Sequence, residues 1–372
     1  MVFMTIFLLQ TNFFCQVVFC SLSCRQEAST SFHQVSLNLF ADTLLFKCFI
    51  QVECGNLHLL QPGTNFLALR CITRKPLKYF LDKRLETFTH YDGTSGIDVE
   101  KDGSVYQGQD YRRLFNLARC ENGLEERMEA YMVAVYLLRI LQQMEYFGPR
   151  SDTSSLTEEE VYIGMLLAHF VQVAERNSQS MNELGEDHQG LTTLPLILAF
   201  EPSAVGYGIH PTLALVNHSC EPNTVKVQHG GKTILVAARR IEQGEQILDN
   251  YGPNFYTSQL EERKRELGFT CTCAACKEDW PLLGKLSSTL NLANTPSPLT
   301  AAGSLERGRM ANALMAKLTN ELALCHYGKV IALCGEYSLL LSKLVSRPHR
   351  FHFNVYMLAF YAAWAKWGAK QG

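Results

Sequence analysis

Apolar residues recur at three- and four-residue spacing in five segments of the chain, which predicts five amphipathic helices. The first covers residues 116–147 and ends at Gly148-Pro149. The second follows Thr157-Glu158-Glu159-Glu160, which has the form of a capping box. The last three cover 310–324, 329–344 and 353–367. Their short separations indicate antiparallel helix pairs of a helical-repeat kind, although two pairs are too few to establish a repeat.

The pattern changes in the middle of the chain, where short runs rich in Val, Ile and Thr replace the helical spacing. Residues 224–227 and 233–237 predict a hairpin that turns through His229-Gly230-Gly231. A third strand is expected at 246–248, after the turn at Gln243-Gly244. The fold class is therefore predicted to be α+β, with helices inserted before a β core and stacked after it.

Composition supports a folded protein and gives no sign of nucleic-acid binding. The 372 residues are 47% hydrophobic and 19% charged, with a formal net charge of −2. This balance is typical of globular proteins and provides no overall attraction to phosphate backbones. The longest local basic run, Arg263-Lys264-Arg265, is interpreted as a solvated helix face. We therefore expect no direct nucleic-acid binding.

The cysteines are spaced for metal binding rather than for disulfides. There are 13 of them, and Cys271, Cys273 and Cys276 fall on one tight loop. A disulfide between the first two would be strained. Zinc requires four soft ligands in a tetrahedron, so a fourth must come from elsewhere. Cys220 is the natural donor, and the alternative is three free thiols on a surface loop.

The first 19 residues are mostly apolar and uncharged, which alone would fit a signal peptide or a membrane anchor. Several polar residues interrupt them, and neither a basic start nor a small-x-small cleavage site accompanies them. We therefore expect no membrane attachment. A membrane-tethered protein is the alternative that rests on this segment alone.

Three motifs occur in a specific order. Asn217-His218-Ser219-Cys220-x-Pro222-Asn223 comes first, Gly244-Glu245-x-Ile247 leads to Tyr251, and the Cys-x-Cys-x-x-Cys loop follows. They resemble the SET domain and post-SET loop of lysine methyltransferases. The stretches 206–211 and 250–253 make the chain most similar to the SMYD (SET and MYND domain-containing) family.

The resemblance implies a SET β-fold core with inserted helices, a zinc post-SET loop and a C-terminal helical, TPR-like tail. The expected divisions, in chain order, are an unassigned apolar segment, a partial and interrupted MYND-type zinc finger, the helical SET insert, the SET core, the post-SET zinc loop, a linker and the helical tail. They cover residues 1–16, 17–54, 55–200, 201–252, 253–280, 281–303 and 304–372.

The resemblance also assigns roles to residues. Asn217 and His218 would hold S-adenosylmethionine through side-chain and backbone hydrogen bonds, and Phe269 would stack on its adenine ring. Asn177 would also contact this cofactor, with a helix C-terminal asparagine as the alternative. Tyr251 would be the catalytic phenol that orients the substrate lysine, and it would also contact the cofactor. The alternative for Tyr251 is a hydrogen-bonded core tyrosine.

The N-terminal part departs from the family pattern. Cys20, Cys24, His33 and Cys54 resemble the second half of a MYND finger, interrupted by an apolar insert at 35–51. We interpret this insert, and residues 1–16, as translated non-coding sequence. Neither the finger's first Cys-x-x-Cys pairs nor a Gly-x-Gly cofactor loop before the finger is found. We therefore expect the chain as given to bind the cofactor weakly or not at all, and so to be a weak or inactive enzyme.

The function implied by the resemblance is protein-lysine N-methyltransferase, with S-adenosylmethionine and Zn²⁺ as cofactors. The partner would be a protein, histone or non-histone, that presents a lysine side chain. We expect a monomer in the cytoplasm, the nucleus or both. The alternative function is a catalytically silent zinc-binding scaffold.

Overall fold

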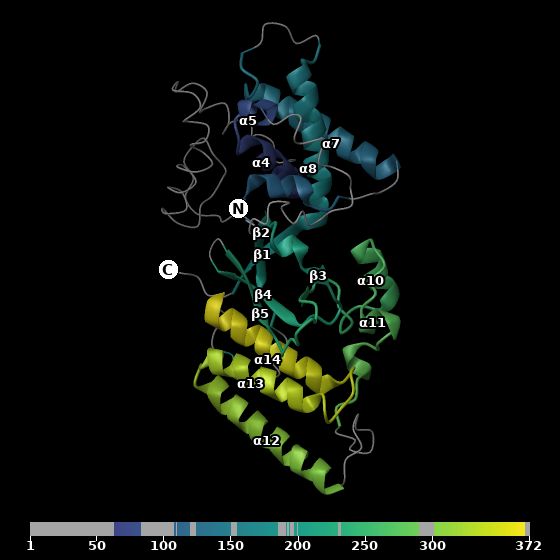
Figure 1. The fold of residues 1–372 in the computed structure, drawn as a ribbon, viewed down its shortest axis with the longest axis vertical. Helices are drawn as coiled ribbons and strands as arrows, with labels where there is room; N and C mark the ends of the chain where they lie inside the picture. The colour runs from purple at the N-terminus through teal and green to yellow at the C-terminus, as the bar shows by residue number, and fades with distance from the viewer. Residues whose placement is uncertain are drawn as a thin grey trace. The chain divides into compact units, whose positions relative to one another are not determined.

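The computed structural model describes most of the chain as two compact units (Figure 1). The described residues are 63–82, 108, 110–119, 124–149, 155–184, 191, 193, 197–198, 200–229, 232–289 and 301–368. The first unit contains residues 1–181 and 205–215, and the second contains 182–204 and 216–372. The apolar segment 1–16 and the finger residues Cys20, Cys24, His33 and Cys54 lie outside the described residues.

The first unit is helical. Its elements are α4 (Gly63–Thr73), α5 (Leu77–Asp82), the 3₁₀ helix η2 (Tyr111–Asn116), α7 (Leu124–Gln143), α8 (Glu158–Asn177) and the 3₁₀ helix η4 (Leu213–Leu215). α8 packs against both α4 and α7. Leu137 and Leu141 of α7 and Ile163, Leu167 and Phe170 of α8 are fully buried in this core. The apolar spacing that predicts the two long helices marks their packed faces only in part, because Met132 and Val135 of α7 and Met165 of α8 are exposed.

The predicted helix over 116–147 is too long at its start. α7 begins at Leu124, and residues 117–119 are not helical. The Ala118 carbonyl instead accepts a hydrogen bond of 2.7 Å from Nδ2 of Asn177, at the end of α8. The chain thus leaves the helical path to pair with α8, a tertiary contact that local spacing does not encode.

The predicted capping box of α8 is confirmed. The Glu160 backbone N–H donates to Oγ1 of Thr157 at 3.2 Å, and the Thr157 N–H donates to Oε2 of Glu160 at 2.8 Å. Glu160 is fully buried and also accepts a 2.9 Å hydrogen bond from Gln142 of α7. The cap therefore also links the two helices.

Strands β1 (Ser178–Glu183) and β2 (Ser203–Ile209) pair with each other, and the boundary between the two units falls within both. In the second unit, β4 (Thr224–His229) and β5 (Lys232–Ala237) form the predicted antiparallel hairpin. The third predicted strand is shifted: β6 is Leu248–Asp249, and 246–247 lie outside it. β6 pairs in parallel with the two-residue strand β3 (Asn217–His218).

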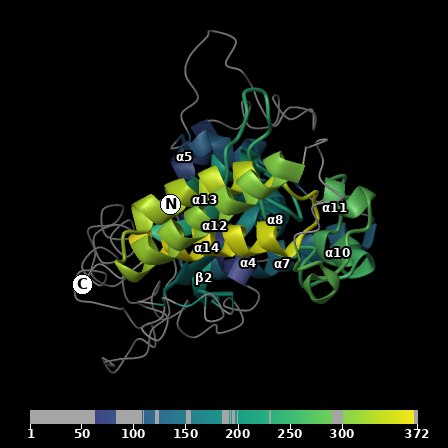
Figure 2. The ribbon, with the colours of Figure 1, turned by 90° about the horizontal axis from the view of Figure 1, so that it is seen from below.

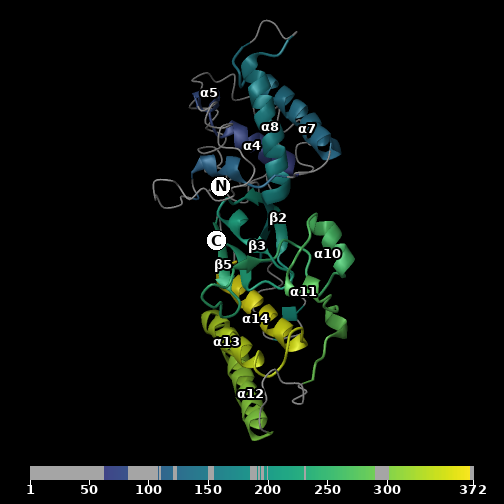
Figure 3. The same ribbon diagram turned by 45° about the vertical axis from the view of Figure 1, so that its right-hand side comes forward.

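Three long helices form the C-terminal part of the second unit, after the short helices α10 (Leu260–Leu267), α11 (Ala274–Lys277) and η5 (Leu283–Lys285). α12 (Ala301–Ala323) packs on α13 (Tyr327–Leu341), and α13 packs on α14 (Arg350–Trp367). Figures 1 and 2 show them as neighbouring layers with nearly aligned axes. α14 also contacts β4, so it lies between the hairpin and α13 (Figure 3). The three tail helices are confirmed, but α12 begins nine residues earlier than expected, within the predicted linker.

The protein thus has a mixed fold of helices and sheet, as expected. In the part of the chain that the structure describes, no helix combines the length and apolar character needed to cross a bilayer.

A buried histidine should make the second unit sensitive to mild acid. His352 is 6% exposed, and burial, with the nearby Arg347, lowers its pKa to about 3. In the unfolded chain, the His352 imidazole becomes protonated near pH 6.5. In the folded unit, it stays neutral until the pH is far lower. The stability that depends on neutral His352 is therefore complete above pH 6.5 and is lost as pH falls toward 3. Between pH 6.5 and 5 this loss is about 2 kcal/mol.

Urea unfolding of the second unit at pH 8 and pH 5 measures this effect. The His352→Gln variant should show a free energy of unfolding that falls less between the two pH values than that of the unmodified chain. An equal fall in both chains would mean that other groups cause the acid sensitivity.

Candidate metal and cofactor site

The site is built where the 217–223 turn lies beside the 248–252 segment. The parallel pairing places Asn217 opposite Leu248 and His218 opposite Asp249. The Ser219 N–H then donates to the Asp249 carbonyl at 2.8 Å, and Nδ2 of Asn250 donates to the Ser219 carbonyl at 3.1 Å. Two segments 30 residues apart in sequence are thereby held in one fixed register.

The Asn223 side chain holds the end of this turn by hydrogen bonds. It is completely buried. Its Nδ2 donates to the Gln246 carbonyl at 2.8 Å and to Oε1 of Glu245 at 3.1 Å, and its Oδ1 accepts the Leu248 N–H at 2.8 Å. The hydrogen bond from Arg239 to Glu245 lowers the pKa of that carboxyl to about 2. Asn223 thus provides hydrogen-bond partners for the backbone groups that lead into β6.

Tyr251 follows β6 directly and is anchored at two points. Its hydroxyl donates to the Val216 carbonyl at 2.7 Å, and its backbone N–H donates to Nδ1 of His218 at 3.1 Å. The side chain is nevertheless 44% exposed. Burial of the rest of it, with the charge of Asp249, raises the pKa of the phenol. Tyr251 is therefore an accessible, neutral phenol rather than a core tyrosine.

Three aromatic rings gather at this point. The His218 ring lies 5.2 Å from that of Tyr251 and 6.0 Å from that of Phe269, and the last two are 6.4 Å apart. Phe269 is 41% exposed. It follows α10 (Leu260–Leu267), which ends at Gly268 with a φ of 64°. The structure thus brings together three of the residues predicted for cofactor binding, and Asn217 of β3 is exposed beside them.

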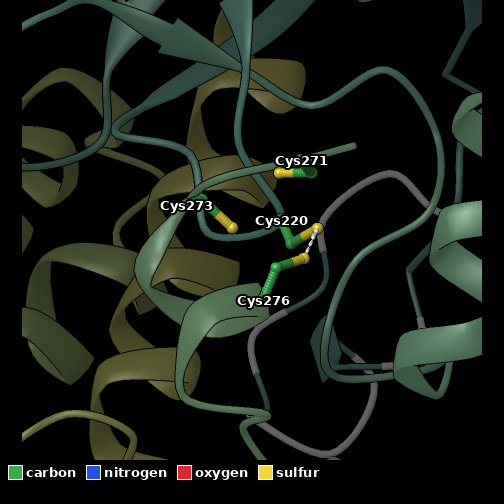
Figure 4. A group of neighbouring side chains, drawn as sticks. All are labelled: Cys220, Cys271, Cys273 and Cys276. Carbon is green, nitrogen blue, oxygen red and sulfur yellow. Dashed lines mark hydrogen bonds between the residues drawn. The ribbon is translucent and has the colours of Figure 1, made fainter. Parts of the chain in front are cut away.

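The four predicted metal ligands form one cluster. The Sγ atoms of Cys220, Cys271, Cys273 and Cys276 all lie within 4.8 Å of one another. Figure 4 shows the side chains converging, with Cys220 and Cys276 in contact at 3.5 Å. A tetrahedral zinc–thiolate site with bonds of 2.3 Å has sulfur–sulfur edges of about 3.8 Å. The four sulfurs are therefore close enough together to bind one metal ion.

The electrostatics of these thiols favour a cation among them. The hydrogen bond that Cys273 accepts from Cys220 lowers the pKa of Cys273 to about 4 and, with burial, raises that of Cys220. Burial also raises the pKa of Cys271 to about 11. Several thiolates this close together repel one another, and a divalent cation offsets that repulsion.

The sulfur cluster rests on a small apolar core. Cys220 is fully buried in it, together with Phe255, Trp280 and Phe353. Arg263 of α10 is also buried, and it donates to the Ser258 and Ala275 carbonyls at 2.7 and 3.2 Å. The interpretation of the 263–265 run as a solvated face is therefore wrong for Arg263. Because Ala275 lies in α11 (Ala274–Lys277), the arginine ties α10 to the cysteine loop.

Two ion pairs around the turn could not be predicted from the local sequence. Glu221, next to Cys220, pairs with Arg347 from the segment between α13 and α14. Lys226 of β4 pairs with Asp249 of β6 at 2.8 Å, and both side chains are largely buried. The partners are 126 and 23 residues apart. Charge alone cannot select such partners from a sequence.

Three other residues considered from the sequence make contacts of their own outside this cluster. Asn177 belongs to the first unit, where Nδ2 donates to the Val173 and Ala118 carbonyls, as a helix-terminal asparagine would. His210 contacts the sulfur of Met181 at 3.3 Å, and Nδ1 of His229 lies 2.6 Å from the Trp367 carbonyl. The two histidines therefore make structural contacts.

Comparison with known proteins gives the same family as the motifs. A SET domain family model matches residues 125–252, which include most of α7, all of α8 and every strand from β1 to β6. Protein-lysine N-methyltransferase SMYD4 of Mus musculus is 22% identical over 284 residues, which are 69% of this chain and 35% of that protein.

Two further relatives are similar over shorter stretches. Histone-lysine N-methyltransferase SMYD3 of Mus musculus is 31% identical over 36% of this chain and 33% of its own length. A SET and MYND domain-containing protein of Dictyostelium discoideum is 35% identical over 21% of this chain and 6% of its own length. The chain thus covers about a third or less of each relative. The chain is thus similar to proteins of the SMYD family over its SET domain match and its flanks.

Proposed function

We propose that this protein is a protein-lysine N-methyltransferase that uses S-adenosylmethionine, with one zinc ion in the four-cysteine cluster. The observation that carries the proposal is the exposed Tyr251 phenol, held by the turn that also supplies Cys220 to the sulfur cluster. Relatives named as lysine methyltransferases, similar over part of their length, support the reaction class. The substrate is a lysine side chain of a histone or another protein, met in the cytoplasm or nucleus.

Tyr251 positions the attacking amine. The phenol proton is committed to the Val216 carbonyl, so the hydroxyl oxygen offers its lone pairs to an incoming N–H. Fixing the amine in this way supplies orientation, which can account for a large share of a rate enhancement. The raised pKa of Tyr251 keeps it protonated at neutral pH. It therefore acts as a hydrogen-bonding group and not as a base.

The amine attacks only when it is neutral, whereas a free lysine has a pKa of about 10.4. Docking of the amine beside Tyr251 would remove water from it, and desolvation lowers the pKa of an ammonium group. The chemistry that S-adenosylmethionine supplies when bound is a methyl group activated by a positively charged sulfur. That charge also disfavours an ammonium beside it.

Within the second unit, Phe269, Asn217 and His218 would contact the cofactor. Phe269 offers a ring face for the adenine, and Asn217 offers an exposed side-chain amide. Both ring nitrogens of His218 lie against other groups, so its contact with cofactor would come from the backbone. Asn177 would take part through Oδ1, because two carbonyls accept from its Nδ2. Cys220, Cys271, Cys273 and Cys276 would hold zinc, which would fix the loop after Phe269.

The test is methyl transfer from labelled S-adenosylmethionine to proteins of a cell extract. Tyr251→Phe removes the positioning hydroxyl and should lower the rate about a hundredfold. The matched control is Tyr131→Phe, which removes the hydroxyl of an exposed tyrosine of α7 and should leave the rate unchanged.

Calorimetry with S-adenosylmethionine accompanies the assay. Equal label with Tyr251→Phe and the unmodified chain would contradict the role of the phenol. Because weak cofactor binding is expected of the chain as given, the deciding sample is a zinc-loaded chain with the Gly-x-Gly strands of the family restored at its N-terminus. Absence of both label and binding heat from that chain would overturn the enzymatic proposal and favour a zinc-binding scaffold.

A further inference from the structure

His218 lies between the sulfur cluster and the proposed catalytic tyrosine. Its Nε2 is 3.3 Å from Sγ of Cys220, and its Nδ1 is 3.1 Å from the backbone nitrogen of Tyr251. The ring is partly buried, and its plane is tilted by 50° from that of Tyr251. One imidazole therefore contacts both the cluster and the segment after β6.

These two contacts determine where the ring carries its proton. A backbone N–H can only donate, so Nδ1 must accept the hydrogen bond from Tyr251 with its lone pair. An imidazole with an unprotonated Nδ1 has its hydrogen on Nε2. Among the described residues, the partner at hydrogen-bond distance from this Nε2–H is Sγ of Cys220. The sulfur is thus an acceptor of this hydrogen bond.

We propose that His218 is a positioning residue, whose Nε2–H supports the Cys220 thiolate as a metal ligand while its Nδ1 holds the backbone of Tyr251. The role of Tyr251 in this statement rests on the function proposed above. A thiolate accepts hydrogen bonds more strongly than a thiol does. Metal binding to Cys220 therefore strengthens the Nε2–H···S bond and, through the polarised ring, the bond from the Tyr251 N–H.

The consequence is a physical link from the metal to the phenol. The Tyr251 hydroxyl is bonded to Val216 and its N–H to His218, so both anchors of Tyr251 come from the same short stretch of chain. That stretch leads directly into Cys220, which the metal would fix. Loss of metal should therefore loosen Tyr251 even where the helices of the second unit remain folded.

The first test needs no substitution. Nitrogen-15 NMR of histidine-labelled chain, loaded with zinc, reports which ring nitrogen carries hydrogen. A proton on Nε2 of His218 at pH 7 supports the proposal. A proton on Nδ1 overturns it, because that nitrogen could not then accept from Tyr251.

Two substitutions separate the two contacts. In His218→Gln, the amide Nε2 takes the place of the ring Nε2 and keeps a donor for the sulfur. In His218→Asn, the amide Oδ1 takes the place of Nδ1 and keeps an acceptor for Tyr251. Zinc affinity from chelator competition should fall about tenfold in His218→Asn, in the range usual for lost outer-shell partners of a metal ligand. It should stay within about threefold of the unmodified chain in His218→Gln.

Hydrogen exchange of the Tyr251 amide should show the opposite pattern, faster in His218→Gln and unchanged in His218→Asn. Unchanged zinc affinity and unchanged amide exchange in both variants would overturn the proposal. If both His218 variants lost zinc binding as completely as a variant that lacks one cluster cysteine, His218 would be a direct metal ligand. That result would also overturn the proposal. None of these readouts depends on methyl transfer, so the inference and the proposed function can fail separately.

Discussion

Replacing Cys276 by serine is expected to abolish stoichiometric zinc binding and to lower the stability of the second unit. The four sulfurs lie within 4.8 Å of one another, so each would provide a quarter of the ligand set. A ligand that binds only the folded state at about a thousand times its Kd stabilises it by about 4 kcal/mol. For a unit of this size, that loss lowers the thermal midpoint by about 8–16 °C.

Metal analysis after dialysis and thermal unfolding followed by circular dichroism measure the two effects. The matched control is Cys325→Ser, because Cys325 is an exposed free cysteine of the same unit and lies outside the cluster. It should keep its zinc and change stability by less than about 0.5 kcal/mol. If Cys276→Ser retained one zinc per chain, the cluster would not be the metal site.

Replacing Asn223 by alanine should destabilise the second unit by about 2–4 kcal/mol. The side chain is fully buried and serves two backbone groups, the Gln246 carbonyl and the Leu248 N–H, as well as the Glu245 carboxylate. Alanine leaves these groups in the interior without that partner, which costs more than the loss of an exposed hydrogen bond. Chemical unfolding gives the free energy directly.

Two further variants identify the cause. Asn217→Ala removes an exposed asparagine from the same turn and should change stability by less than about 0.5 kcal/mol. Asn223→Asp keeps the shape but places a carboxylate against the Gln246 carbonyl and the Glu245 carboxylate. It should therefore be at least as destabilising as alanine at neutral pH. A stability loss below 0.5 kcal/mol in Asn223→Ala would show that water replaces the side chain.

The metal cluster was the most predictable part of the site. Three cysteines on one loop restrict each other's positions, and the Asn217–Cys220 motif predicted the fourth sulfur of the cluster, 51 residues before the loop. Tyr251, His218 and Phe269 were likewise found by motif, and the structure places their rings together. Short, chemically unusual patterns of this kind carry information about distant contacts.

The helices were predictable because their packed faces repeat locally. In α13, Val330, Leu333, Cys334, Tyr337 and Leu341 follow the three- and four-residue spacing and are buried. The boundaries were less predictable where a tertiary contact determined them. Residues 117–119 leave the helical path to meet Asn177, and β6 is positioned by the hydrogen bonds of Asn223 rather than by β propensity.

The role of Arg263 could not be predicted for a related reason. Its neighbours in sequence are exposed and charged, whereas its two carbonyl partners come from residues 258 and 275. The same holds for Glu221, whose partner Arg347 lies in the tail. Contacts of this kind depend on which helices and strands pack together, and the local sequence does not determine this packing.

The central claim is that one metal ion joins Cys220 to the Cys271–Cys276 loop and so fixes the turn that holds Tyr251. X-ray absorption at the zinc edge of the purified chain tests it most directly. We predict one zinc per chain with four sulfur ligands at about 2.3 Å, and no stoichiometric zinc in a Cys220→Ala chain. An unmodified chain without stoichiometric zinc, or a Cys220→Ala chain that still holds one zinc with an unchanged sulfur count, would contradict the claim.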